Sequence, residues 1–359
     1  MRFRIETVVV AAAAAFAWSI SIAAPLLAAA PSPAAEKESA RRRWAVVSSK
    51  ACQANGLSDL FKASLSDAGG IELVERDDLK LAVKELELSA LFGSENASRR
   101  LKLGRILKAD ALVILSIEKR ADAAFVKMIV SECRHGARLR TEFQPFRPAD
   151  VEQIAGRLAA VVSEVRRRIG DGVTHLLCVP PFLSKNLTHD YDHLQVGYAS
   201  LLISSLERFP GVAVVEVEEA RAIDRELRLT AENLKDRVVP LFVEGEFKMS
   251  AAKPGDKPKV QMTLSLVDAQ HGRKRYEQPP LSFDEVTDLL TRRAPEGILR
   301  RAKIGPQKPL TRQQQTKLLS DRAEVFSLIG ARPHSIGLRE AALLLSPDDV
   351  KMRLALIRD

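Results

Sequence analysis

The sequence has few of the residues, and none of the motifs, on which most enzymes and metal proteins depend. Among its 359 residues are only three cysteines, Cys52, Cys133 and Cys178, and they are spaced too widely for a zinc site. A glycine-rich phosphate loop, a nucleophile elbow and an HExxH motif are all absent. We therefore expect a protein that is not an enzyme and that needs no cofactor.

The odd number of cysteines limits disulfide bonding. At most one bridge can form, and Cys178 lies in the apolar run of residues 176–179, where we expect a buried, inert thiol. Cys52 and Cys133 remain the pair whose bonding is open in an exported protein.

Aromatic residues are scarce as well, at 5% of the sequence, so the cores should be built mainly from Leu, Val, Ile and Ala. The formal net charge is +9, and the cations are clustered. Most clusters interleave with apolar residues at helical spacing, which predicts solvated helix faces. Because no aromatic residues alternate with the cations to stack bases, we expect no binding to nucleic acid. The clusters are Arg41 to Arg43, Arg99-Arg100 with Lys102, Arg105 and Lys108, Arg166 to Arg168, and Arg292-Arg293 with Arg300, Arg301 and Lys303.

The N-terminus has the layout of a bacterial export signal. Arg2 and Arg4 precede a nearly uncharged run that starts at Thr7 and ends in small residues. Cleavage after Ala34 would make residues 1–34 the signal peptide. The apolar run is also long enough to span a bilayer, so an uncleaved anchor is the alternative. Since no cysteine precedes Cys52, we expect no lipid tether. We predict an exported, periplasmic protein, with association with the outer membrane, peripheral association with a membrane, or anchoring by the uncleaved leader as the alternatives.

A long internal repeat organises the chain. Residues 60–88 recur without a gap as residues 201–229, and nine positions are identical in the two stretches. Both read as a helix, a terminating glycine, a short β-rich run and a second helix. The repeat predicts two tandem α/β domains, at residues 43–170 and 173–304. The identical residues of the first stretch are Leu60, Ser64, Leu65, Gly70, Val74, Glu75, Glu85, Leu86 and Leu88.

Hydrophobic periodicity predicts the same order of elements in both domains. An alternating strand in each, at residues 124–132 and 260–266, is expected to be a half-exposed edge. Pro295 should break or kink the last helix. For the first domain we predict strands at 44–47, 71–75 and 111–117 and helices at 58–67 (capped by Ser58), from Asp77, at 98–108 and at 149–169. For the second we predict strands at 176–179, 212–215 and 238–243 and helices at 194–208, 218–229 and 283–302, with a short helical insertion at 230–236 and a turn at 253–256.

A linker at residues 305–309 leads to a helical segment, residues 311–359. Helices are expected at 311–328 and 334–345, and a third begins after Pro347. The segment has the spacing of small, aromatic and proline positions in a tetratricopeptide repeat, at Ala323, Phe326, Gly330, Ala342 and Pro347. Because so few repeats cannot form a stable solenoid, we expect this segment to pack on the second domain or on a partner.

One cluster suggests metal chemistry. His189 and His193 stand four apart with Asp190 and Asp192 between them, a spacing that can bind a metal on a helix. The stretch falls at a loop-to-helix junction, where capping by Asp190 or Asp192 is the favoured interpretation. The carboxylates Glu75 and Glu85, with their repeats Glu216 and Glu226, resemble an acid–base pair, but their duplication favours a role in the fold.

The first copy resembles the curli-assembly CsgG family, whose pattern is a hydrophobic-Val-Glu-Arg-acid-Asp-Leu run followed by an Ala-Asp strand. The matching fold residues are Val74, Glu75, Arg76, Asp77, Asp78, Leu79, Ala109 and Asp110. The same broad fold is similar to the N-terminal domain of TolB and to outer-membrane activators of peptidoglycan synthases. The resemblance implies three-layer α/β domains with mixed sheets, a cell-envelope assembly role and no catalytic residues. The second copy departs from the pattern, since Val217 replaces Arg76.

Two departures bear on the alternatives. The family's pore-forming members carry a lipidation motif, which is lacking here, and apolar-faced hairpins that line a pore. In this chain the matching strands carry Lys127, Glu132, Arg138 and Arg140. We therefore favour a non-enzymatic periplasmic scaffold that binds envelope proteins through its C-terminal helices. A secretion-pore subunit, an activator of a peptidoglycan synthase and a hydrolase that uses His189 and His193 remain the alternatives, and the oligomeric state stays open.

Overall fold

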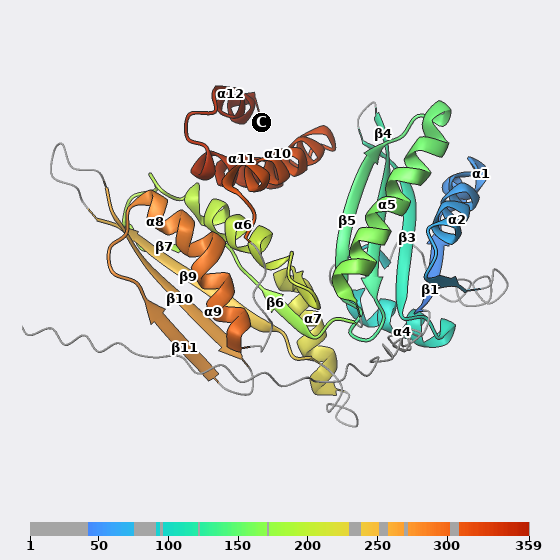
Figure 1. The fold of residues 1–359 in the computed structure, drawn as a ribbon, viewed down its shortest axis with the longest axis horizontal. Coiled ribbons are helices and arrows are strands. Elements are labelled where there is room, and N and C mark those ends of the chain that lie inside the picture. Colours follow the sequence, from blue (N-terminus) through green and yellow to red (C-terminus); the bar gives the residue numbers. More distant parts are fainter. Residues whose placement is uncertain are drawn as a thin grey trace, which may run out of the picture. The chain divides into compact units, whose positions relative to one another are not determined.

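In the computed structural model, the chain builds two β-sheets with helices packed against them (Figure 1). The residues that the structure describes are 42–74, 91–93, 96–120, 123–170, 172–229, 238–250, 258–268, 272–301 and 309–358. The expected leader, the motif residues Glu75 to Leu79, and the insertion and turn predicted at 230–236 and 253–256 lie outside them.

The first sheet, sheet A, has five strands in the order β2-β1-β3-β4-β5. Strand β1 pairs in parallel with β2 and β3, while β3 with β4 and β4 with β5 are antiparallel. The central strand β3 is apolar and buried on both faces over its first half, as its continuous hydrophobic run predicts. The strands are β1 (Arg42–Ser48), β2 (Ile71–Leu73), β3 (Ala111–Arg120), β4 (Ala123–Glu132) and β5 (Arg138–Pro145).

Helices cover both faces of sheet A, which gives three layers. Alternate residues of β1 point in opposite directions: Trp44 packs in one core cluster with α2 and α5, and Ala45 packs in another with α4. The helices are α1 (Lys50–Ala54), α2 (Leu57–Asp67), α4 (Ala97–Leu107), the short 3₁₀ turn η3 (Pro148–Asp150) and α5 (Val151–Ile169).

The second sheet, sheet B, has the order β11-β10-β9-β6-β8, with β7 beside β9. Strand β6 is parallel to β8 and β9, and β9, β10 and β11 are antiparallel in turn. Strand order and pairing sense therefore repeat those of sheet A. The strands are β6 (His175–Cys178), β7 (Leu183–Ser184), β8 (Val212–Val215), β9 (Leu241–Met249), β10 (Val260–Asp268) and β11 (Gly272–Glu277).

One face of sheet B packs against α6, α8 and α9, and the other against α7, whose Ala220 shares a core cluster with Cys178 and with residues of sheet A. The irregularity in this predicted helix is a π-helical turn, η5, which ends at Arg293, and Pro295 lies in the first turn of α9, where it cannot donate a helical hydrogen bond. The helices are α6 (Leu194–Leu206), α7 (Val217–Leu229), α8 (Phe283–Asp288), η5 (Leu289–Arg293) and α9 (Ala294–Arg301).

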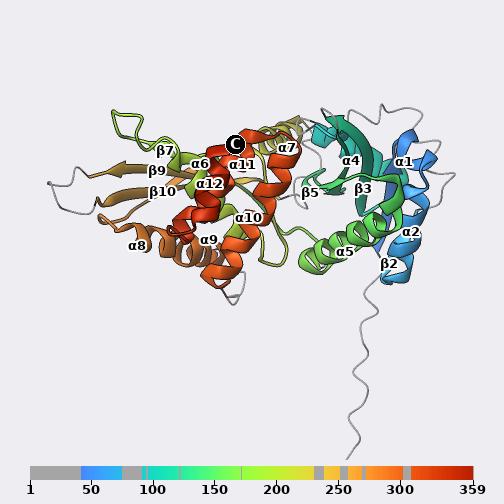
Figure 2. The same cartoon turned by 90° about the horizontal axis from the view of Figure 1, so that it is seen from above.

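Three helices follow, α10 (Arg312–Leu328), α11 (Arg332–Leu345) and α12 (Val350–Arg358), seen from above in Figure 2. A capping box of Thr311 and Gln314 starts α10. Helix α11 lies along α6, and its Ala341 and Leu345 enter the core of sheet B. The C-terminal helical segment thus packs on the second α/β half, which is the half built on sheet B, as the first is built on sheet A. This is one of the two sites expected for the segment.

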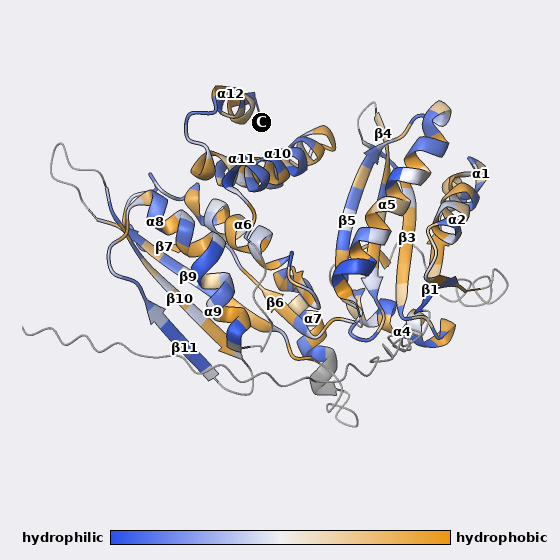
Figure 3. Cartoon of the chain, in the orientation of Figure 1, coloured by the Kyte–Doolittle hydropathy of each residue, from blue (hydrophilic) through white to orange (hydrophobic). Residues whose placement is uncertain are grey.

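Two expectations about the elements are wrong. Strands β4 and β10 are internal, and the outer strands beyond them are β5 and β11, which are hydrophilic in Figure 3. Helix α2 begins at Leu57 after Gly56, which has a φ of +73°, so Ser58 is not its cap; the Ser58 hydroxyl instead accepts a hydrogen bond from Ser48. Within the described residues, no helix is both long and apolar enough to cross a bilayer.

Candidate functional site

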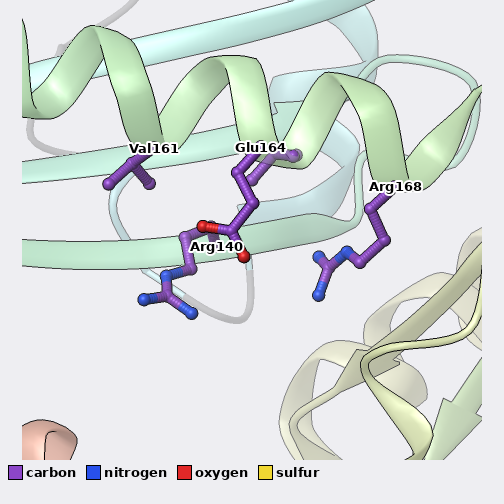
Figure 4. A pocket seen from close by; sticks show the side chains of 5 residues that line it. Arg140, Val161, Glu164 and Arg168 are labelled. Atoms are coloured by element: carbon purple, nitrogen blue, oxygen red, sulfur yellow. The ribbon is translucent and has the colours of Figure 1, made fainter. Parts of the chain in front are cut away.

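The described residues contain no group of three or more His, Cys, Asp or Glu side chains placed to hold a metal ion. A small pocket is lined by Arg140, Val161, Glu164, Val165 and Arg168, where α5 passes β5 (Figure 4). Its polar lining is ionic and holds no nucleophile beside a base, the arrangement that covalent catalysis requires.

The histidine cluster is solvated. His189 is 95% exposed, and its Nδ1 lies 2.7 Å from the Asp192 carboxylate, which raises the pKa of the imidazole. Helix α6 begins after His193, which makes no side-chain capping bond. The expected capping by Asp190 or Asp192 is therefore wrong, because Asp192 bonds to His189 instead.

The described motif residues hold strands together. The Asp110 carboxylate accepts a hydrogen bond of 2.9 Å from the backbone N–H of Arg43, and the N–H of Asp110 donates to the Arg43 carbonyl. Asp110 thereby fixes the start of β3 against β1. Val74 and Ala109 are buried in the cluster between sheet A and α4.

A buried ionic cluster joins the two α/β halves. Glu219 of α7 is 1% exposed, and its carboxylate accepts hydrogen bonds from the side chain of Arg100 on α4 and from the backbone and side chain of Arg138 on β5. Arg138 also pairs with Glu216 at 2.8 Å. Burial lowers the pKa of the Arg138 guanidinium, but the two carboxylates raise it more, so its pKa lies above the ordinary value. The side chain of Glu226, the other repeated carboxylate, is outside the described set.

Arg100 contradicts the expectation that its basic cluster is a solvated helix face, since its side chain is 0% exposed. Its guanidinium donates to the carbonyls of Gly136, Leu91 and Gly93 as well as to Glu219. Gly136 has a φ of +74°, and a Cβ there would lie 2.1 Å from the Ala97 carbonyl oxygen, so only glycine allows this approach.

Sequence reasoning missed Arg100 and Glu219, although a signal existed. Ala97, Arg100, Leu101, Gly104 and Leu107 follow helical i, i+3, i+4, i+7 and i+10 spacing, so Arg100 stands within the buried stripe of its helix. An arginine on such a stripe predicts a buried carboxylate partner. Nothing local in the sequence could have named Glu219, which comes from the other half of the chain.

A second contact between the halves passes through a histidine. His135, in the turn between β4 and β5, accepts a hydrogen bond of 3.0 Å at Nε2 from the N–H of Val238, ahead of β9. Its Nδ1 lies 2.6 Å from Glu132 Oε1. Because Nε2 accepts, Nδ1 must carry the proton, and His135 bridges the two halves as the neutral tautomer.

The C-terminal helices make a third contact, which reaches both halves. Arg322 of α10 pairs with Glu207 at 2.7 Å, and Arg168 of α5 donates to the Glu207 carbonyl and to the carbonyl of Leu139 on β5. Phe326 of α10 packs edge-on against Phe143 of β5, with ring centroids 6.3 Å apart. Helix α10 therefore spans from the second half to sheet A.

The thiols are structural. Cys52 lies in the cluster on the α2 and α5 face of sheet A and Cys133 in the cluster on the opposite face, so the sheet separates the pair that remained open for a disulfide. Burial raises the pKa of both, and it raises the pKa of Cys178 to about 12. The expectation of a buried thiol at Cys178 is confirmed.

The chain was compared with protein families, curated proteins and solved structures. No curated protein matches the chain. The crystal structure of lipoprotein GNA1162 from Neisseria meningitidis aligns with 37% of this chain and 99% of its own length, at 19% identity and a TM-score of 0.22. Residues 35–119, which include β1, α2, α4 and all of β3 except its last residue, match the family described as curli production assembly/transport component CsgG.

Proposed function

We propose that this chain is a non-enzymatic assembly or scaffold protein of the CsgG type, which is exported to the cell envelope and acts through protein contacts. The observation that carries the proposal is that the buried charged and polar side chains between the two α/β halves hold parts of the chain together. Contacts between the two halves occupy the side chains of Arg100, Glu219, Arg138 and His135. The match of residues 35–119 to a transport and assembly family supports the envelope setting.

The proposal includes two copies of the family fold. The identical strand order and pairing sense of sheets A and B support a duplication, with boundaries near residues 43–170 and 173–304. The helical segment of residues 311–359, with its tetratricopeptide-like spacing, is proposed as an added module that braces both copies through its contacts with α6 and β5.

Fractionation tests the proposed setting. The full chain, with its own leader, would be expressed in a Gram-negative host, the envelope fractionated, and the extracted protein sized by gel filtration with light scattering. A scaffold is expected in the periplasmic fraction with the mass of one or two chains. Retention in the cytosol would overturn export, and a large ring in the outer membrane would replace the scaffold by the secretion pore suggested by the family's transport role.

A further inference from the structure

Helix α12 presents a hydrophobic seam that no other described part of the chain covers. Val350, Leu354 and Ile357 are 63%, 57% and 81% exposed. Their spacings of four and three residues place them at d, a and d of a heptad, on one side of the helix. The opposite side is occupied, because Met352 and Ala355 are buried where α12 packs on α11.

Cations flank this seam on both sides. In the same heptad, Lys351 and Arg358 take e positions and Arg353 takes the g position, and all three are exposed. The Arg353 guanidinium also donates to the carbonyl of Pro347, which holds it beside the helix. In a coiled-coil seam the e and g charges select the partner. Among the described residues that flank this helix in the sequence, the acidic ones are Asp348 and Asp349, which stand ahead of it, and the Asp349 carboxylate is occupied as its cap, accepting a hydrogen bond from the N–H of Met352.

We propose that α12 docks an acidic amphipathic helix of a partner protein, with apolar residues at its a and d positions and Glu or Asp at e and g. The charges exclude a second copy of α12 as the occupant, because any parallel or antiparallel pairing would set cations against cations. A membrane surface fits less well: the seam is the narrow a/d type, carries no aromatic residue, and lies on a helix whose other side is already packed.

The inference rests on the proposed function, since it names the class of partner that the scaffold would bind. The probe is a synthetic helix of four heptads with Leu at a and d and Glu at e and g, labelled for fluorescence anisotropy. The matched control peptide has Lys instead of Glu at its e and g positions. The full folded chain is expected to bind the acidic peptide at least about tenfold more tightly than the basic one.

Variants locate the binding. Leu354→Asp should weaken binding of the acidic peptide about tenfold or more, whereas Leu187→Asp, the same change at a leucine exposed in a loop, should leave it unchanged. A triple variant, Lys351→Glu with Arg353→Glu and Arg358→Glu, should reverse the preference toward the basic peptide. All of these side chains are exposed, so the fold should be retained, which circular dichroism verifies.

Several results would overturn the inference. Equal affinity for the two peptides, or full binding by Leu354→Asp, would show that α12 does not select an acidic helix. Binding to vesicles of anionic phosphatidylglycerol, lost in Leu354→Asp, without peptide selectivity would assign the seam to a membrane. Dimerisation that Leu354→Asp abolishes would assign it to a second copy. A periplasmic chain that fails the peptide test would lose only this surface and would keep the proposed function.

Discussion

Replacing Arg100 by Met is the sharpest test of the contact between the two halves. The substitution preserves a long apolar side chain but removes the guanidinium that serves Glu219 and three backbone carbonyls. Among the described residues, Arg138 then remains as the cation paired with the Glu219 carboxylate. A carboxylate that is 1% exposed would then be left with half of its charge compensation.

The magnitude follows from the burial. Removing one partner of a buried ion pair costs about 3–5 kcal/mol, because the remaining charge and acceptors stay desolvated without a donor. Because Arg138 still pairs with Glu219, we expect Arg100→Met to lower the free energy of unfolding by about 3 kcal/mol, near the lower end of this range. Adding Glu219→Gln removes the orphaned charge, so the double variant should lose less stability than the sum of the two single variants.

Urea denaturation followed by circular dichroism measures this effect. The matched control is Arg99→Met, because Arg99 is the neighbouring residue on the exposed side of α4 and should change the free energy of unfolding by less than about 0.5 kcal/mol. If Arg100→Met lay within that same range of the wild type, the buried cluster would not be holding the halves together, and the reasoning from burial and geometry would be refuted.

Three further predictions follow from the pKa shifts. Burial raises the pKa of Glu207, but Arg322 and Arg168 lower it more, so this pKa lies below the ordinary glutamate value. The stability that the Glu207 carboxylate contributes is therefore complete above the ordinary glutamate pKa and is lost as the pH falls below it. Wild type should lose more thermal stability than Glu207→Gln between about pH 5 and pH 3. Burial raises the pKa of Glu340 to about 7, which favours its neutral form, so the melting temperature of wild type should fall relative to Glu340→Gln as the pH rises from about 5 to 7.5, and parallel curves would contradict this. The three buried thiols should react with Ellman's reagent only after denaturation, and fast reaction of the native chain would disprove their burial.

Local patterns in the sequence predicted where the helices and strands lie, but not which elements pack against one another. The run of residues 111–117 is apolar at every position but Ser116, and a strand buried on both faces is the one element that accommodates it. The prediction for β4 was wrong because alternation of apolar and polar residues is typical of a strand with one exposed face. Lys127 does lie among apolar residues, but its ammonium sits over the rings of Phe92 and Phe143 and pairs with Glu118, so the strand is covered.

The hydrogen-bond partners of buried polar side chains could not be predicted from the sequence either, because they come from distant parts of the chain. The partners of Arg100 and His135 come from residues more than 100 positions away, Glu219 and Val238, and only the fold brings them together. The capping error at Asp192 arose because a nearby imidazole competes for the carboxylate. The separation of Cys52 from Cys133 depends on which face of sheet A each meets, and spacing alone does not carry that information.

Site-specific photo-crosslinking in the native host tests the scaffold role together with the proposed α12 surface. A photoreactive amino acid would replace Leu354 on α12 in one strain and Leu187 in the control strain. A scaffold of the envelope should give an adduct with an exported protein from position 354, and it should be absent from position 187. Adducts made only of copies of this chain, in a ladder that extends to a ring, or adducts with cytosolic proteins would contradict the account.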